Sequence, residues 1–199
     1  MKDTEKAVIA AFDFDGTITT KDTLFDFIRF CCGVPGLLSG LVFLSPILFF
    51  FKLGLIRNDK AKQKLLSYFF KGFSVDKFNR KSIDYATKID TILRPDIADR
   101  LAYHKENGHK IIIISASVEN WIRPWAERNG ISEVLGTRLE TENGVLTGHF
   151  SSPNCYGAEK VNRLKAVYPD RENYILYAYG DSAGDKELLA FADYPTLVQ

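Results

Sequence analysis

The chain has 199 residues, 46% of them hydrophobic and 26% charged, with a formal net charge of +1. This length and composition suit a compact domain with an insertion, because a chain of this size can bury a sizeable core. The near-zero charge, without a dense patch of Lys and Arg among aromatic residues, argues against a nucleic-acid partner.

The cysteines and the N-terminus predict a cytoplasmic location. Cys31, Cys32 and Cys155 are few and odd in number, so we expect reduced thiols and no disulfide framework. Residues 1–6 include acids and lack the apolar core of a signal peptide.

The first predicted strand ends in two carboxylates. Residues 7–12 form an apolar run without polar alternation, which indicates a strand covered on both faces, as in a parallel sheet. Asp13 and Asp15 follow directly within Asp13-Phe14-Asp15-Gly16-Thr17. Open parallel sheets bind ligands outside the carboxyl ends of their strands, so these acids stand where chemistry is expected.

A long insertion follows, over about residues 19–90, and its first half is unusually apolar. Residues 30–51 contain no charged side chain, but Gly33, Pro35, Gly36, Gly40 and Pro46 divide them into pieces of roughly ten residues or fewer, shorter than a spanning helix of about 20. Three interpretations remain open: an apolar segment packed on itself and on the core, a surface that enters a membrane or grips a lipid tail, and a transmembrane helix.

Basic residues follow this apolar stretch and also allow two interpretations. They either meet anionic head groups or form a solvated helix face. They are Lys52, Arg57, Lys60, Lys62 and Lys64.

Strands and helices alternate through the rest of the chain, which is typical of a doubly wound parallel sheet. We expect Trp121 and Trp125 to face the core, and His104, His109 and His149 to be surface or capping residues. The predicted elements are a helix from Arg94-Pro95-Asp96 to Asn107-Gly108, a strand over 111–114, a helix over 118–128, a hairpin over 135–150 that turns at Asn143-Gly144, a helix over 158–168, a strand over 174–179, a helix over 185–191 and a short strand over 196–198.

Two later strands also deliver polar side chains at their ends. The strand over 111–114 leads to Ser115, and the strand over 174–179 leads to Asp181, with Asp185 four residues further on. If these strands neighbour the first one in a single sheet, all these side chains meet in one crevice. Such convergence is what a metal-assisted site needs.

This ordered set resembles the four motifs of the haloacid dehalogenase superfamily of phosphohydrolases. The resemblance spans residues 7 to about 198 and implies an α/β fold, with a doubly wound three-layer parallel sheet, a Rossmann-like core and an inserted helical cap. The motif residues are Asp13 and Asp15, Ser115, Lys160 within Gly157-Ala158-Glu159-Lys160, and Asp181 with Asp185.

The resemblance implies a two-step hydrolysis of a phosphomonoester. Asp13 attacks phosphorus to form an aspartyl-phosphate, and Asp15 protonates the leaving alkoxide and then deprotonates the hydrolytic water. An Asp two places after the nucleophile implies a phosphomonoesterase rather than a transport ATPase or a carbon-halogen hydrolase. A phosphotransferase shares these residues, and a binding module without turnover is the alternative from another class.

The resemblance also implies Mg²⁺, because two carboxylates that face a phosphate need a hard cation. Its ligands are the carboxylates of Asp13 and Asp181 and the main-chain carbonyl of Asp15, with Asp185 binding directly or through water. Lys160 neutralises the phosphate. The Ser115 hydroxyl and the main-chain N–H groups of Phe14 and Ala116 hold the phosphate oxygens.

The position of the insertion resembles the cap of the phosphoserine phosphatase-like branch, subfamily IB. It implies a catalytic core over 1–18 and 91–199 and a helical cap over 19–90. Asp22 stands where that branch has a Glu for the substrate amine, and Lys60 or Lys64 stands where it has an Arg for the carboxylate. Since Lys cannot copy a bidentate Arg grip, phosphoserine is an alternative substrate. The expected substrate is a small or lipid-linked phosphomonoester, and the alternative location is peripheral, on the cytoplasmic face of the membrane.

Overall fold

The computed structural model describes residues 6–199 and has a five-stranded parallel sheet at its centre. The strand order β3-β2-β1-β6-β7 confirms the predicted doubly wound α/β fold. Residues 1–5 lie outside the described residues, and the expectation for the N-terminal segment, that it lacks the apolar core of a signal peptide, falls on them. The strands are β1 (Ala7–Phe12), β2 (Lys110–Val118), β3 (Glu133–Thr137), β6 (Tyr174–Gly180) and β7 (Tyr194–Leu197).

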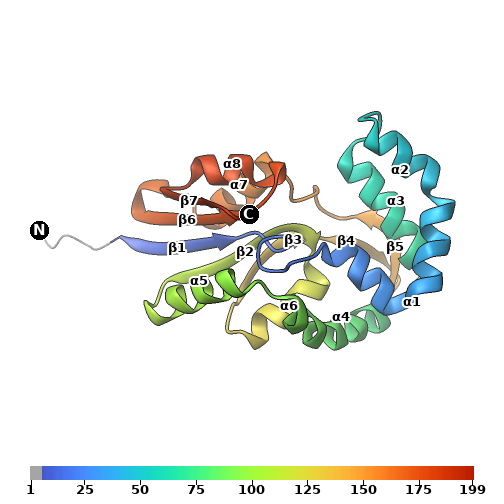
Figure 1. Ribbon diagram of the computed structural model, residues 1–199, viewed down its shortest axis with the longest axis horizontal. Coiled ribbons are helices and arrows are strands. Elements are labelled where there is room, and N and C mark those ends of the chain that lie inside the picture. The colour runs from blue at the N-terminus through green and yellow to red at the C-terminus, as the bar shows by residue number, and fades with distance from the viewer. Residues whose placement is uncertain (1–5) are drawn as a thin grey trace, which may run out of the picture.

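Helices cover both faces of this sheet, which explains why its strands lack polar alternation. Successive residues of a strand point to opposite faces. Phe12 and Ile113 therefore lie in one buried cluster, whereas Ala11 and Ile112 lie in another. Figure 1 shows α5 and α6 on one side of the sheet and α7 and α8 on the other. These helices are α5 (Pro95–Glu106), α6 (Glu119–Arg128), α7 (Ala158–Val167) and α8 (Lys186–Phe191).

Four helices form the segment predicted to be the cap, on the right of Figure 1. Asp22 begins the first of them, because its side chain accepts a hydrogen bond of 2.8 Å from the Leu24 N–H. The boundaries at residues 18/19 and 90/91 stay a prediction. The helices are α1 (Thr23–Phe43), α2 (Ser45–Lys52), α3 (Asn58–Phe70) and α4 (Val75–Ile89), and a 3₁₀ turn over Asp90–Ile92 follows them.

The expected hairpin over 135–150 is partly wrong. Residues 135–137 belong to β3 in the central sheet, where Leu135 pairs with Ile114. The hairpin consists of β4 (Leu139–Glu142) and β5 (Val145–Phe150), and it turns at Asn143-Gly144 as predicted, with both residues at positive φ. Turn chemistry fixes the hairpin only near its turn, and the apolar pattern does not say which partner a strand takes.

This hairpin joins the cap helices although about 50 residues of sequence separate them. Main-chain hydrogen bonds of 2.8 to 2.9 Å link Gly72 N–H to the Leu146 carbonyl and Leu146 N–H to the Phe73 carbonyl. The hairpin is therefore hydrogen-bonded to the segment between α3 and α4.

A kink divides the long apolar helix α1. By length and composition α1 is able to cross a membrane, but Gly33 has φ 72° and ψ 173°, which no helix contains. Each half of α1 is about ten residues, shorter than the roughly 20 that a span needs. The predicted interruptions at Gly33 and before Pro46 are confirmed, whereas Pro35, Gly36 and Gly40 lie inside the helix.

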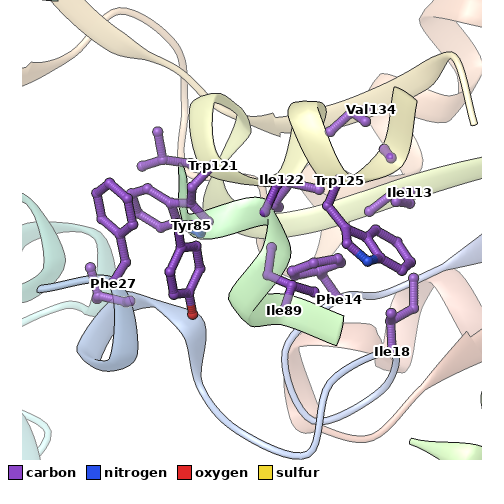
Figure 2. Packing of buried hydrophobic residues seen from close by; sticks show 14 of the residues in the cluster. Phe14, Ile18, Phe27, Tyr85, Ile89, Ile113, Trp121, Ile122, Trp125 and Val134 are labelled. Atoms are coloured by element: carbon purple, nitrogen blue, oxygen red, sulfur yellow. The ribbon is translucent and has the colours of Figure 1, made fainter. Parts of the chain in front are cut away.

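Aromatic side chains join the cap to the core (Figure 2). The Phe27 ring of α1 stacks on Trp121 of α6 at 4.8 Å and meets Tyr85 of α4 edge-on at 5.2 Å. Phe14 packs against Trp125 at 5.6 Å. Both tryptophans are fully buried, which confirms their predicted place in the core.

His104 is a buried residue, and its predicted surface role is wrong. Its Nε2 lies 2.9 Å from the Tyr179 hydroxyl, and its Nδ1 lies 2.7 Å from Nδ1 of His109. Burial lowers the pKa of His104 from 6.5 to about 4, and the neighbouring His109 and Arg100 act in the same direction. The sequence pattern indicated only that His104 is a polar residue near a helix end. It did not show that the Tyr179 hydroxyl lies next to the ring.

Acid is therefore expected to destabilise the protein through His104. Between pH 6.5 and about 4 the unfolded chain binds a proton on this residue that the folded chain does not. The free energy of unfolding thus falls as pH falls through this window, by up to about 3 kcal/mol. Urea titrations at several pH values should show a weaker pH dependence in His104→Gln. His149→Gln, at an exposed site, is the control, and equal pH dependence in wild type and His104→Gln would contradict this account.

Candidate active site

The carboxyl ends of three neighbouring strands bring the predicted residues together. β1 lies between β2 and β6, so Asp13 stands between Ser115 and Asp181. The Asp13 N–H still donates to the Tyr179 carbonyl at 2.9 Å, which fixes Asp13 at the end of the strand pair. A cavity of about 300 Å³ opens here, and its lining includes Asp13, Asp15, Ser115, Lys160 and Asp181.

Ser115 lies inside β2 rather than after it, because the strand continues to Val118. The pairing of β2 with β3 shifts register between Ile114 and Val118, so the strand is irregular where it passes the cavity. The Ser115 Oγ accepts a hydrogen bond of 3.0 Å from the Ser117 N–H. Ser115 is therefore fixed at the cavity wall.

Lys160 is an almost fully buried cation between two carboxylates. Its Nζ lies 2.5 Å from Asp13 Oδ1 and also donates to Asp185 Oδ1. Lys160 lies in the first turn of α7, and the preceding Gly157 N–H donates to the Gly184 carbonyl at 3.0 Å. That bond ties the start of α7 to the loop that contains Asp181 and Asp185.

Burial is the main cause of the pKa shifts of the acids in this site, and neighbouring carboxylates add to it. Burial raises the pKa of Asp13 to about 7, although Lys160 opposes the shift. Burial also raises the pKa of Asp181, and the nearby Asp185 adds to the effect. For Lys160, burial disfavours the ammonium, but Asp13 and Asp185 outweigh it and raise its pKa. Lys160 thus faces both Asp13 and Asp185.

Carboxylate oxygens of Asp13, Asp181 and Asp185 lie within 4.8 Å of one another, close enough to hold a metal ion. An all-oxygen set beside one lysine fits a hard divalent cation. Asp185 is set back from the cavity, and its Oδ2 accepts from the Ser182 N–H at 3.1 Å and the Ser182 Oγ at 2.9 Å. Asp13 and Asp181 are therefore the more accessible ligands, and the Asp15 carboxylate is outside this cluster.

Gly16 allows Asp181 to approach the first strand end. It has φ 76°, and a Cβ there would lie 2.2 Å from Asp181 Oδ2. Thr17 Oγ1 donates to Asp181 Oδ1 at 3.3 Å. Gly16 and Thr17 belong to the predicted motif, but neither was predicted to contact Asp181. The need for glycine follows from a contact with a distant part of the chain.

The start of the cap holds the Asp15 carboxylate. Its Oδ1 accepts from the Thr23 N–H at 2.7 Å and the Thr23 Oγ1 at 2.5 Å, and its Oδ2 accepts from Ser117 Oγ. The Trp121 Nε1–H donates to Thr23 Oγ1 at 3.1 Å and fixes that hydroxyl. Sequence reasoning missed Thr23 and Ser117, because neither stands out from an ordinary helix start or strand residue.

Loss of the Thr23 hydroxyl is expected to misplace Asp15. We expect Thr23→Val to lower kcat by roughly 10- to 100-fold, because small displacements of a reacting group have effects of this size. Thr20→Val, at a nearby exposed site, is the control. Steady-state kinetics in which both variants match wild type would contradict a positioning role for Thr23.

Lys62, rather than Lys60 or Lys64, is the cap lysine of this cavity. The Lys62 Nζ donates to the Ala116 carbonyl at 2.9 Å, whereas Lys60 and Lys64 are exposed and line a separate groove. The prediction of Lys60 and Lys64 as substrate residues is therefore corrected. Residues 60 and 64 are one helical turn apart on one face of α3, and residue 62 faces the other way.

Asp22 lines the cavity as predicted, together with Lys62. Burial raises the pKa of Asp22, and the Asp15 carboxylate adds to this. Burial lowers the pKa of Lys62, although Asp15 and Asp22 oppose it. Phe14 is buried and does not line the cavity, whereas Ala116 does, so the contact of the Phe14 main chain with a phosphate stays a prediction.

The cavity also includes residues that were not predicted to belong to the site. They lie where loops of the core and the start of α3 meet the strand ends. These are Asn58, Tyr156, Ser182 and Gly184.

Comparisons with known proteins agree with this geometry. The family model of the haloacid dehalogenase-like hydrolases matches residues 10–190. Protein CicA of Caulobacter vibrioides is 34% identical over 189 residues, covering 94% of this chain and 83% of CicA.

Two solved structures show the shared fold. A Bordetella pertussis protein of unknown function has a TM-score of 0.85 at 18% identity, covering 97% of this chain and 90% of that one. A phosphoserine phosphatase solved with a phospho-aspartyl intermediate analogue has a TM-score of 0.65 at 18% identity, covering 94% of this chain and 84% of that one.

Proposed function

Because this chain belongs to the haloacid dehalogenase-like hydrolase family, we propose that it is a Mg²⁺-dependent phosphomonoesterase that acts through a phosphorylated Asp13. One observation supports this most strongly: Lys160 lies between Asp13 and Asp185, beside Asp181, at the open end of the sheet. Phosphoryl transfer needs charge compensation and positioning more than any other help from a protein.

The two carboxylates of the first motif have separate tasks in this proposal. An Asp13 oxygen attacks phosphorus, the phosphorus–oxygen bond of the ester breaks, and the leaving oxygen takes a proton from Asp15. Water then attacks the phosphorus and gives a proton to Asp15, and the bond between phosphorus and Asp13 breaks. Inorganic phosphate leaves, and both side chains return to their first state.

Separate anchors support the two tasks. Asp13 contacts Lys160, whereas both oxygens of Asp15 are hydrogen-bonded by Thr23 and Ser117. The Ser115 hydroxyl and the main-chain N–H groups of Phe14 and Ala116 are assigned to the phosphate oxygens.

Asp13 and Asp181, with the main-chain carbonyl of Asp15, would hold Mg²⁺, and Asp185 would bind it directly or through water. The donor set fits, because these carboxylates are close together and Lys160 alone forms ion pairs with them in the described part of the chain. The bound ion supplies charge neutralisation and orients the phosphate.

Metal dependence provides the first test. We expect phosphate release from p-nitrophenyl phosphate to stop in EDTA and to return with Mg²⁺. Asp181→Asn should raise the half-saturating Mg²⁺ concentration at least about tenfold, because it removes a ligand charge. Asp170→Asn, at an exposed acid, is the control. Hydrolysis that is unchanged in EDTA would contradict the proposal.

For the substrate we propose a small or lipid-linked phosphomonoester. Phosphoserine is a second candidate, because Asp22 and Lys62 line the cavity with opposite charges that would suit an amine and a carboxylate. A panel of phosphoserine, sugar phosphates, nucleotides and phosphatidylglycerophosphate would separate these substrates. Added alcohol acceptors would reveal a phosphotransferase, and no release from any compound would favour a binding module.

A further inference from the structure

The outer end of the cap exposes a concentrated apolar surface. We name residues 34–56 the cap tip; it comprises the second half of α1, all of α2 and the turn that follows. Nine of the eighteen exposed large hydrophobic residues in the described part of the chain lie in these 23 positions, so this exposure is not scattered. Figure 1 shows α2 at the outer edge of the molecule, away from the sheet.

The cap tip is apolar on both its inner and its outer side. Leu37, Ile47 and Leu48 pack inward against the core, and a Cβ on Gly40 would overlap the Phe69 ring, so α1 and α3 are in close contact. Outward, Val42 and Phe43 are 73% and 70% exposed. α2 has no buried residue although its sequence is almost wholly apolar. A helix of this kind is stable when another apolar phase covers it.

Positive charge borders this apolar surface. Residues 30–64 contain five Lys or Arg and one Asp, a net charge of +4 in a chain whose total is +1. Beside the cap tip lies a groove of about 410 Å³, with Ile47, Leu55 and Ile56 as its apolar part. Its cationic part is Arg57, Lys60 and Lys64. An apolar surface flanked by cations complements an anionic lipid surface better than another protein core.

The groove also leads toward the active-site cavity. Arg57 lines both this groove and a neighbouring hollow, and Asn58 and Tyr156 line both that hollow and the cavity of Asp13. The groove is therefore connected through this hollow to the cavity that contains the catalytic carboxylates.

We propose that the cap tip docks on the surface of a bilayer that contains anionic phospholipid. The outer side chains of the cap tip enter the boundary between head groups and acyl chains, and Lys60 and Lys64 lie beside lipid phosphates. The kink at Gly33 lets the second half of α1 lie along the surface, because neither half is long enough to span it. If the proposed phosphatase function holds, a lipid-linked phosphate reaches Asp13 from this surface.

The test is flotation of the full chain with vesicles of phosphatidylcholine alone or mixed with phosphatidylglycerol. We expect binding to the mixed vesicles, weaker by at least about tenfold in a triple variant with Leu38→Ser, Val42→Ser and Phe49→Ser. These side chains are exposed, so the fold should persist, which circular dichroism checks. Ile83→Ser with Leu197→Ser, at equally exposed apolar sites elsewhere, should bind as wild type does.

The contribution of positive charge is tested with the double variant Lys60→Ala, Lys64→Ala. We expect this variant to bind mixed vesicles about tenfold or more weakly than wild type, and its binding to phosphatidylcholine vesicles to be unchanged. Wild type that floats with neither vesicle, or a triple variant that binds unchanged, would overturn the proposal. So would a lipid-free dimer in sedimentation that the triple variant dissociates, because a second copy would then cover the cap tip.

Hydrolysis of p-nitrophenyl phosphate by the triple variant separates this proposal from the phosphatase function. We expect its rate to equal that of wild type. If the triple variant loses vesicle binding but keeps its full rate of hydrolysis, the cap tip serves docking alone. If wild type binds vesicles but hydrolyses nothing, the catalytic proposal is refuted and the docking proposal stands.

Discussion

Replacing Asp13 with Asn is expected to lower the turnover of p-nitrophenyl phosphate by roughly 10⁴-fold or more. The amide is a poor nucleophile for phosphorus and removes one of the charges in the carboxylate cluster, and loss of a nucleophile typically has an effect of this size. Asp13 lies 2.5 Å from the Lys160 ammonium, so the variant also loses this ion pair.

The comparison with stability makes this test sharper. Because burial raises the pKa of Asp13 to about 7, its charge is poorly tolerated in the metal-free fold. Asp13→Asn should therefore unfold at a temperature close to that of wild type while its activity is lost. Asp170→Asn serves as the surface control. Residual turnover within about tenfold of wild type would exclude Asp13 as the nucleophile.

Replacing Lys160 with Met is expected to impair both folding stability and catalysis. Its ammonium is the cation that contacts Asp13 and Asp185, and its side chain is 2% exposed. Removing one partner from a buried ion pair leaves uncompensated charge, which costs about 3 to 5 kcal/mol. Loss of a cation that faces the transferred phosphoryl group should also lower kcat roughly 10²- to 10³-fold.

A double variant separates the contributions of charge and packing to the loss of stability in Lys160→Met. Lys160→Met with Asp185→Asn should recover part of the stability that Lys160→Met loses, because one orphaned charge is removed. Lys165→Met, on the exposed face of the same helix, is the control. Urea unfolding in EDTA measures these differences. Equal stability of Lys160→Met and wild type would show that the buried pair has no structural role.

Three of the residues that sequence reasoning located share one property: each follows an apolar run at a fixed place in an ordered motif. These residues are Asp13, Ser115 and Asp181. The carboxyl ends of parallel strands lie along one edge of a sheet, so residues at these ends are brought together. The fold class was predictable for the same reason, since unbroken apolar strands alternate with helices.

The residues that it missed depend on contacts between distant segments. Thr23 and Ser117 bind Asp15 from opposite sides of the cap boundary, and neither has a distinctive neighbourhood in the sequence. Lys62 was passed over for Lys60 and Lys64 because composition alone does not give the helix phase, which the periodicity of α3 decides. To predict the burial of His104, one would have to know that Tyr179, 75 positions away, lies beside it.

A burst measurement on Asp15→Asn tests the covalent mechanism most directly. The p-nitrophenolate group leaves without protonation, so Asp13 should still be phosphorylated, whereas activation of the hydrolytic water should fail. We predict one rapid equivalent of p-nitrophenolate per enzyme, slow later turnover, and a phosphoryl group on the peptide that contains Asp13 by mass spectrometry. Steady turnover without a burst and without phosphorylated Asp13 would contradict the account.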